Sequence, residues 1–172
     1  MEGKNAMVTY TSELLSSLIS CKKKVVKSPH KEMKIERGSF RNDLSLKSED
    51  GKWNFSVFMR KNQKFAENFT IGLRYHPQEG ESFTLLRCNG PHGNHIDLER
   101  TNSSHYVFHI HMANIDRLND GVFSERMGTI TDKYASYEEA LSYFIREVGI
   151  MDADQFFPEY IIQLSLFSEE GE

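Results

Sequence analysis

Three histidines stand close together near the middle of the chain, in the segment HYVFHIH at residues 105–111. His105, His109 and His111 alternate with apolar residues, and successive side chains of a β-strand point to opposite faces of its sheet. The segment therefore predicts a strand whose apolar side enters the core and whose histidines share the other side, where His109 and His111 should be accessible to solvent. Imidazole titrates near neutral pH, so two such histidines could act as a general base and a general acid.

Three earlier segments place basic side chains on that same side, and two of them follow the same alternation. In WNFSVFMRK (53–61) and NFTIGLRYH (68–76), the positions opposite the apolar set carry one arginine each, and the second segment adds a histidine. In SFTLLRCN (82–89) the alternation is ambiguous, because Phe83 and Leu85 share a parity with Arg87. We place Arg87 outward, because burying an unpaired guanidinium is costly. The predicted catalytic set is His92, His109, His111, Arg74 and Arg87, and the predicted ligand-binding set is Arg60, His76 and His105.

Three interpretations of this surface stay open at the level of the sequence. In the first, the arginines hold phosphate groups and a histidine pair cleaves a phosphodiester. In the second, the side chains hold a divalent metal such as zinc, with Cys88 as a further candidate beside His92, His95, His109 and His111. In the third, they are the ordinary polar side of a half-exposed sheet, paired with acids on neighbouring strands.

Capping signals and hydrophobic periodicity predict the helices and strands that carry these residues. Thr11 or Ser12 precedes an apolar stripe and predicts an amphipathic helix over residues 10–27, and Ser136 begins a second helix that ends near Gly149. Short polar turns separate the strands between them, which is typical of an antiparallel meander. We expect an α+β fold: a twisted antiparallel sheet of five or six strands, with the N-terminal and C-terminal helices packed on one face. Residues 1–150 would form one domain, and residues 151–172 a C-terminal segment.

Composition limits the class of protein. The chain has 172 residues, a net charge of −4 and only two cysteines, which favours a reducing compartment over a disulfide-linked fold. It has no apolar run long enough for a membrane span and no basic-then-apolar start typical of a secretory signal, so we expect a cytoplasmic protein. Residues 22–41 carry eight Lys/Arg against two acids. That segment favours a solvated helix end and a charged hairpin over nucleic-acid contact.

One long stretch resembles a known family. The run ENFTIGLRYHPQEGESFTLLRCNGPHGNH, the later FHIH and the later ASYEEAL resemble a family of short bacterial proteins classed as a domain of unknown function. The likeness covers about residues 40–148. It implies a bacterial or phage origin and a place on mobile elements, and it implies no reaction.

The C-terminal segment carries a second resemblance. Residues 163–167, QLSLF, look like the pentapeptide by which bacterial DNA-processing proteins bind the replication sliding clamp. Gln163 would fix the register by hydrogen bonds, and the apolar contacts would come from Leu164, Leu166 and Phe167. The alternative is that this segment, which has high β-propensity, forms a final edge strand.

Together these features predict an accessory protein of bacterial or phage DNA metabolism or genome conflict, such as defence, counter-defence or a toxin–antitoxin pair. It would dock on the sliding clamp and present its Arg/His face to nucleic acid or another phosphate ligand. One alternative is a small histidine-dependent nuclease of the toxin type, with or without a metal. A second is a non-catalytic inhibitor or interaction module.

Overall fold

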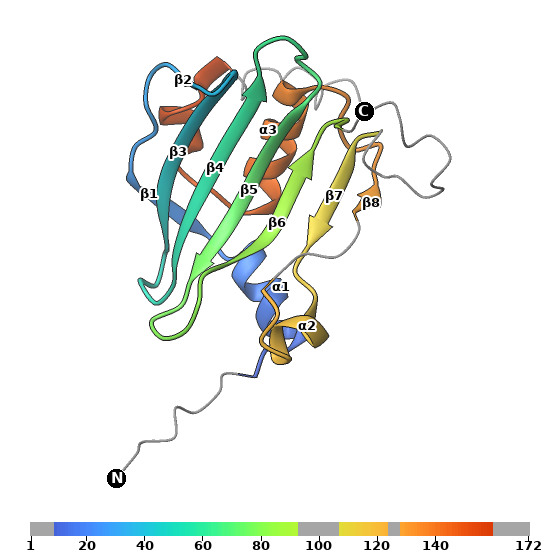
Figure 1. Cartoon of the computed structure of the whole chain (residues 1–172). Coiled ribbons are helices and arrows are strands. Elements are labelled where there is room, and N and C mark those ends of the chain that lie inside the picture. The colour runs from blue at the N-terminus through green and yellow to red at the C-terminus, as the bar shows by residue number, and fades with distance from the viewer. Residues whose placement is uncertain (1–8, 93–106, 124–127, 160–172) are drawn as a thin grey trace, which may run out of the picture.

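The computed structural model describes residues 9–92, 107–123 and 128–159, and it confirms the α+β class with an antiparallel sheet (Figure 1). The sheet order is β1-β3-β4-β5-β6-β7-β8, with β2 also paired to β3. The strands are β1 Lys23–Lys27, β2 Lys34–Glu36, β3 Ser39–Ser48, β4 Asn54–Asn62, β5 Phe69–His76, β6 Phe83–Asn89, β7 His109–Met112 and β8 Thr129–Ile130. The helices are α1 Ser12–Ser20, α2 Ile115–Asn119 and α3 Tyr137–Glu147, followed by a short 3-10 helix, η3, at Ala153–Gln155.

The predicted number of strands is wrong, because the described residues already form a sheet of eight strands rather than five or six. The two strands that the sequence did not indicate, β1 and β8, are short and lie at the sheet edges. The first helix is also shorter than predicted, since it ends at Ser20 instead of continuing to residue 27. The lysine-rich residues after it form β1, where the β-branched Val25 pairs with Leu46 of β3.

Both long helices begin where their capping residues predict. The Thr11 side chain accepts a hydrogen bond from the Leu14 backbone N–H at 3.1 Å, and the Ser136 side chain accepts one from the Glu139 N–H at 3.1 Å. Both helices lie behind the sheet as seen in Figure 1, with α1 against β6 and α3 against β5 and β6. Their buried apolar side chains form one core with the inward residues of the strands.

A buried lysine joins the C-terminal ends of these two helices. Lys23 is 0% exposed, and its ammonium donates to the carbonyl oxygens of Ile19 at 2.7 Å, Cys21 at 2.9 Å and Val148 at 2.8 Å. It also lies 4.7 Å from the centre of the Phe55 ring. The C-terminal end of a helix carries partial negative charge, so this is a favourable place for a cation.

A β-bulge sets which side chains of β6 face the core. The register between β5 and β6 shifts after Leu73, which pairs with Leu86, to Arg74, which pairs with Thr84. Leu85 is the extra residue, so Phe83 and Leu86 both reach the core although their numbers differ in parity. The bulge explains why strict alternation was ambiguous in this segment, and Arg87 points outward as predicted.

The hairpin of β2 and β3 carries additional side chains onto the uncovered side of the sheet. Its two turn residues, Arg37 and Gly38, have φ values of 48° and 75°, as the tight turns of antiparallel hairpins require. The loop before β2 is tied to β3 by Asn42, whose side chain accepts from the His30 N–H at 2.9 Å and donates to the His30 carbonyl at 2.8 Å. This double contact fixes β2 and the loop before it along the sheet edge.

Within the residues that the structure describes, no helix is long and apolar enough to cross a membrane.

Candidate functional site

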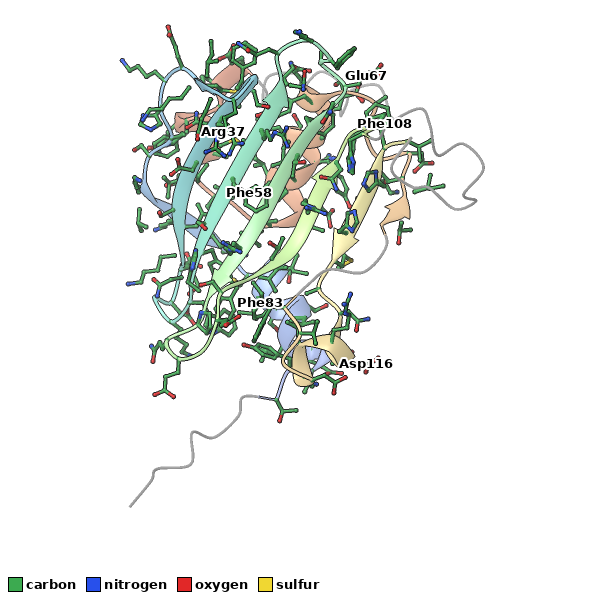
Figure 2. All side chains as sticks on the ribbon, viewed as in Figure 1. Arg37, Phe58, Glu67, Phe83, Phe108 and Asp116 are labelled. Carbon is green, nitrogen blue, oxygen red and sulfur yellow. The ribbon has the colours of Figure 1, made fainter. Side chains whose placement is uncertain are left out.

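The strand registers place the predicted site residues of β4 to β7 on one side of the sheet. Directly opposed residues in an antiparallel sheet point to the same face, as do residues two apart on one strand. One row runs Lys34, Arg41, Arg60, Thr70, Asn89 and His109, and the next runs Asp43, Phe58, Gly72, Arg87 and His111. A third row holds Ser45, Ser56, Arg74 and Thr84, and a fourth holds Lys47, Asn54 and His76. We call this surface, which the two long helices leave uncovered, the open face (Figure 2).

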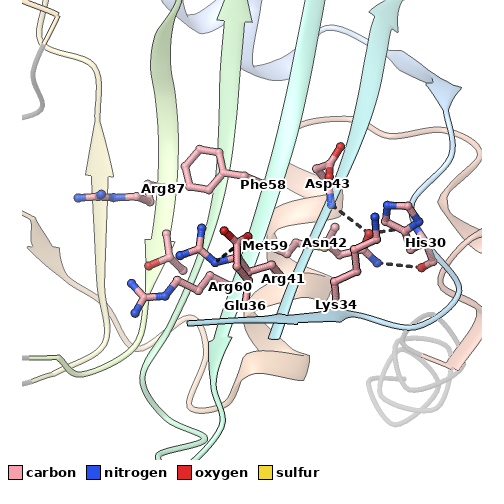
Figure 3. Close-up of a pocket in the computed structure, with 11 residues that line it drawn as sticks. His30, Lys34, Glu36, Arg41, Asn42, Asp43, Phe58, Met59, Arg60 and Arg87 are labelled. Atoms are coloured by element: carbon pink, nitrogen blue, oxygen red, sulfur yellow. Dashed lines mark hydrogen bonds and ion pairs between the residues drawn. The ribbon is translucent and has the colours of Figure 1, made fainter. Parts of the chain in front are cut away.

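A pocket of about 570 Å³ lies on the open face beside the β2 hairpin (Figure 3). Only two predicted site residues, Arg60 and Arg87, line it. The full lining is His30, Lys34, Glu36, Arg41, Asn42, Asp43, Phe58, Met59, Arg60, Thr70 and Arg87. The pocket therefore combines side chains from β2, β3, β4, β5 and β6, which are brought together only by the pairing of the strands.

The pocket is positively charged although the chain as a whole is acidic. Its lining has four cationic side chains and two carboxylates, with His30 counted as neutral, whereas the chain carries −4. Arg60 Nε donates to Ser39 Oγ at 3.0 Å, and Arg41 Nε lies 3.9 Å from a Glu36 carboxylate oxygen. The Arg41 pair is long and exposed, so it leaves the guanidinium able to meet an anion. A set of guanidinium and ammonium groups like this one can hold an anion by charge-assisted hydrogen bonds.

An aromatic side chain lies between the charged groups of the pocket. Phe58 is half-buried, and its ring extends over Gly72 on the neighbouring strand. A Cβ added to Gly72 would stand 2.1 Å from Cζ of this ring and 2.5 and 2.8 Å from its two Cε atoms. Only a glycine leaves room for the ring there, so the space that the ring occupies depends on Gly72.

The two central histidines share the open face, but the prediction that they are exposed to solvent is wrong. His109 is 0% exposed and His111 is 4% exposed. Gly128, just before β8, passes directly against them. A Cβ at Gly128 would stand 2.6 Å from His109 Cδ2 and 3.0 Å from His111 Nε2. The backbone leading into the edge strand β8 therefore covers this end of the face.

Both ring nitrogens of His109 take part in hydrogen bonds. Nδ1 lies 2.7 Å from the Val107 carbonyl oxygen and must donate to it, and Nε2 lies 3.2 Å from Asn89 Nδ2 and accepts from it. Those roles assign the neutral imidazole with its proton on Nδ1. The carbonyl of His109 also accepts from the Tyr134 hydroxyl at 2.7 Å. These contacts hold the ring in place beneath the chain, which suits a structural role better than attack on a substrate.

The histidine group does not form a metal site within the described residues. The rings of His92 and His111 each lie 5.0 Å from the ring of His109, centre to centre. Nevertheless, in the part of the chain that the structure describes, no three His, Cys, Asp or Glu side chains are arranged to hold a metal ion. Burial raises the pKa of the Cys88 thiol to about 12, so this cysteine is an inert core side chain rather than a nucleophile.

Arg74 and His76 lie in the third and fourth rows of the open face, outside the pocket. His76 is held between two hydroxyls, with Nε2 2.7 Å from Ser56 Oγ and Nδ1 2.7 Å from Ser82 Oγ. Burial and, after it, the charge of Arg74 lower the pKa of His76 below its ordinary value. The neutral form fits a residue that fastens the end of β5 to its neighbours.

The pocket contains side chains that sequence reasoning missed. Lys34 and Arg41 belong to the basic stretch 22–41, whose composition favours a solvated helix end and a charged hairpin. Their link to the site is the β2–β3 pairing, which opposes Lys34 to Arg41. Phe58 has the outward parity of Arg60 on the same strand, and that parity was the available signal for it.

Several predicted residues lie outside the described ranges, namely His95, His105, Gln163, Leu164, Leu166 and Phe167.

No protein-family model matches the chain, and neither a curated protein nor a solved structure matches it.

Proposed function

We propose that this protein binds nucleic acid, with the pocket on the open face as the point where it holds the phosphate backbone. The observation that carries the proposal is the convergence of Lys34, Arg41, Arg60 and Arg87 on one pocket of an otherwise acidic chain. A guanidinium offers several N–H donors in a fixed plane that matches the oxygens of a phosphate. Arginines at separate positions of a sheet can hold successive phosphates of one strand.

The pairing of the strands sets the spacing of these cations. Lys34, Arg41 and Arg60 are direct neighbours on three adjacent strands, and adjacent strands are about 4.8 Å apart. Their charges form a line across the sheet rather than a single point. A line of positive charge suits a linear polyanion better than one small ion.

The test measures binding of a fluorescently labelled oligonucleotide by anisotropy as the salt concentration is varied. Three phosphate contacts on a single strand predict a slope of log K against log salt near −2, or roughly a twentyfold loss of affinity between 50 and 200 mM salt. Arg60→Gln removes one contact, so we expect affinity to fall about tenfold and the slope to become shallower by about 0.7.

Arg74→Gln is the matched control, because Arg74 lies on the same face but does not line the pocket. It should change affinity far less than Arg60→Gln. Equal weakening by the two variants would remove the pocket from the proposal. Absence of any oligonucleotide binding by the parent protein would overturn it altogether.

We further propose that residues 163–167 dock this nucleic-acid-binding domain on the bacterial sliding clamp. The support is the sequence QLSLF, in which two adjacent apolar residues follow a glutamine at the spacing of the clamp-binding pentapeptide. Such peptides bind by placing apolar side chains in pockets while the polar residue sets the register. Burying Leu166 and Phe167 would contribute on the order of 3–6 kcal/mol before ordering costs, as in a micromolar peptide contact.

Titration of purified clamp with the parent and with a Leu166→Ala, Phe167→Ala double variant tests the docking. We expect micromolar binding by the parent and at least a tenfold loss in the double variant. Arg60→Gln is the control here and should bind clamp like the parent. Equal affinity of the double variant and the parent would exclude this peptide as the docking element.

A further inference from the structure

We infer that the ligand of the open face is a single-stranded nucleic acid, with one unpaired base stacked on the ring of Phe58. This inference rests on the proposed function and specifies the ligand class of the same pocket. It starts from the composition of the open face. Among the outward positions of β3 to β6, which the structure describes completely, Phe58 is the only large apolar side chain, and the others are charged, polar or glycine.

The position of the ring is built into the sheet. Gly72 lies directly opposite Phe58 on β5, and a Cβ there would stand 2.1 Å from the ring. Gly72 is not among the residues with positive φ, so its backbone does not require a glycine. The ring does, because any side chain at this position would displace it. A glycine inside a strand lowers stability, and here it lets an aromatic ring lie across the sheet.

The charges around the ring match the two parts of a nucleotide. Arg87 lies on the far side of Gly72 in the same row, and Arg60 is two residues from Phe58 on β4. A base stacked on the ring would therefore have arginines close by on two strands to hold its flanking phosphates (Figure 3). Aromatic side chains set among basic groups on an open sheet are a recurring way to bind single strands.

A duplex does not meet this geometry, because its base faces are stacked on one another and only its edges and phosphates are accessible. The ring lies in the lining of a pocket of about 570 Å³, where a single splayed base can reach it. The geometry thus selects single strands by stacking, while the arginines supply affinity that does not depend on sequence.

The experiment compares ligands of closely matched charge on the intact protein. The probes are a labelled single strand of eight nucleotides, as DNA and as RNA, the same DNA with abasic sites, and the corresponding DNA duplex. We expect the abasic strand to bind at least fivefold more weakly than the parent strand, and the duplex to bind more weakly than the single strand. Phe58→Leu should weaken binding of the base-bearing strand by a similar factor and leave binding of the abasic strand unchanged.

Phe58→Trp keeps a stacking surface, so it should bind the base-bearing strand more tightly than Phe58→Leu does. Thermal unfolding checks that both variants fold. Equal binding of base-bearing and abasic strands would overturn the stacking inference and leave the phosphate-binding proposal intact. Tighter binding of the duplex would overturn it as well. If none of the DNA or RNA probes binds, both the inference and the proposed function are wrong.

Discussion

Replacing Lys23 by methionine removes the charge that joins the ends of α1 and α3 and keeps a side chain of similar length. In the native protein the ammonium donates to three backbone carbonyls, those of Ile19, Cys21 and Val148. Lys23 is fully buried, so no water can replace the lost donors without opening the core. Methionine fills the space of the lysine stem and leaves three buried acceptors without a partner.

The size of the effect follows from these contacts. Hydrogen bonds from a charged donor contribute about 1.5–3 kcal/mol each, so three of them give roughly 4.5–9 kcal/mol. Removing the ammonium also removes its desolvation cost, which is several kcal/mol for a buried ion. We therefore expect Lys23→Met to lower the free energy of unfolding by about 3–5 kcal/mol, because three buried carbonyl acceptors lose their donor at roughly 1–3 kcal/mol each.

Urea unfolding followed by the fluorescence of Trp53, the single tryptophan of the chain, measures this change. With a slope near 2 kcal/mol per molar urea, the midpoint should fall by about 1.5–2.5 M. Lys24→Met is the matched control, because Lys24 is exposed on the same strand, and its effect should stay within about 0.5 kcal/mol. A loss below about 1 kcal/mol in Lys23→Met would refute the idea that the ammonium holds the two helix ends together.

Three further predictions concern other parts of the sheet. The pKa of His76 is lowered in the folded protein, so just below pH 6.5 the unfolded chain binds more protons than the folded one. The stability that His76 provides is therefore present above that pH and is lost as the pH falls. Chemical unfolding at pH 7 and pH 5 should therefore show a smaller acid loss for His76→Gln than for the parent, and an equal loss would contradict this. Gly72→Ala should lower the free energy of unfolding by roughly 1–3 kcal/mol, because the added methyl group displaces the Phe58 ring. Adding Phe58→Leu should recover part of that loss in the same assay. Cys88 has a pKa near 12 and no solvent exposure, so it should react with a thiol reagent only in the unfolded protein. The half-buried Cys21 should react in the native state. Native labelling of both thiols would contradict the assigned burial.

The local features of the fold could be predicted from the sequence. Thr11 and Ser136 begin the helices because each caps its own first turn, a contact between residues three apart. The outward parity of Arg60 and of His109 follows from strand geometry, which alternates side chains whatever the neighbours are. These inferences hold because the interactions that decide them lie within a few residues of chain.

The features that depend on distant segments could not be predicted in this way. The bulge at Leu85 changes the parity of half a strand, and it is visible only in the pairing of β5 with β6. The burial of His109 depends on Gly128, which comes from the edge of the sheet. Lys23 was assigned to the end of a helix because lysines favour that place, and its ammonium does bind helix ends, but it does so from a strand.

The candidate site shows the same division. Side-chain alternation was enough to place the arginines and histidines of β4, β5 and β7 on one face, and the cost of burying a guanidinium placed Arg87 of β6 there with them. Contacts between distant segments settle which of these side chains can meet a ligand, because the β2–β3 pairing brings Lys34 and Arg41 beside Arg60 while the chain at Gly128 covers the histidines. The exposure and the charge of a surface depend on segments that are far apart in the chain, and those segments become neighbours only when the strands pair.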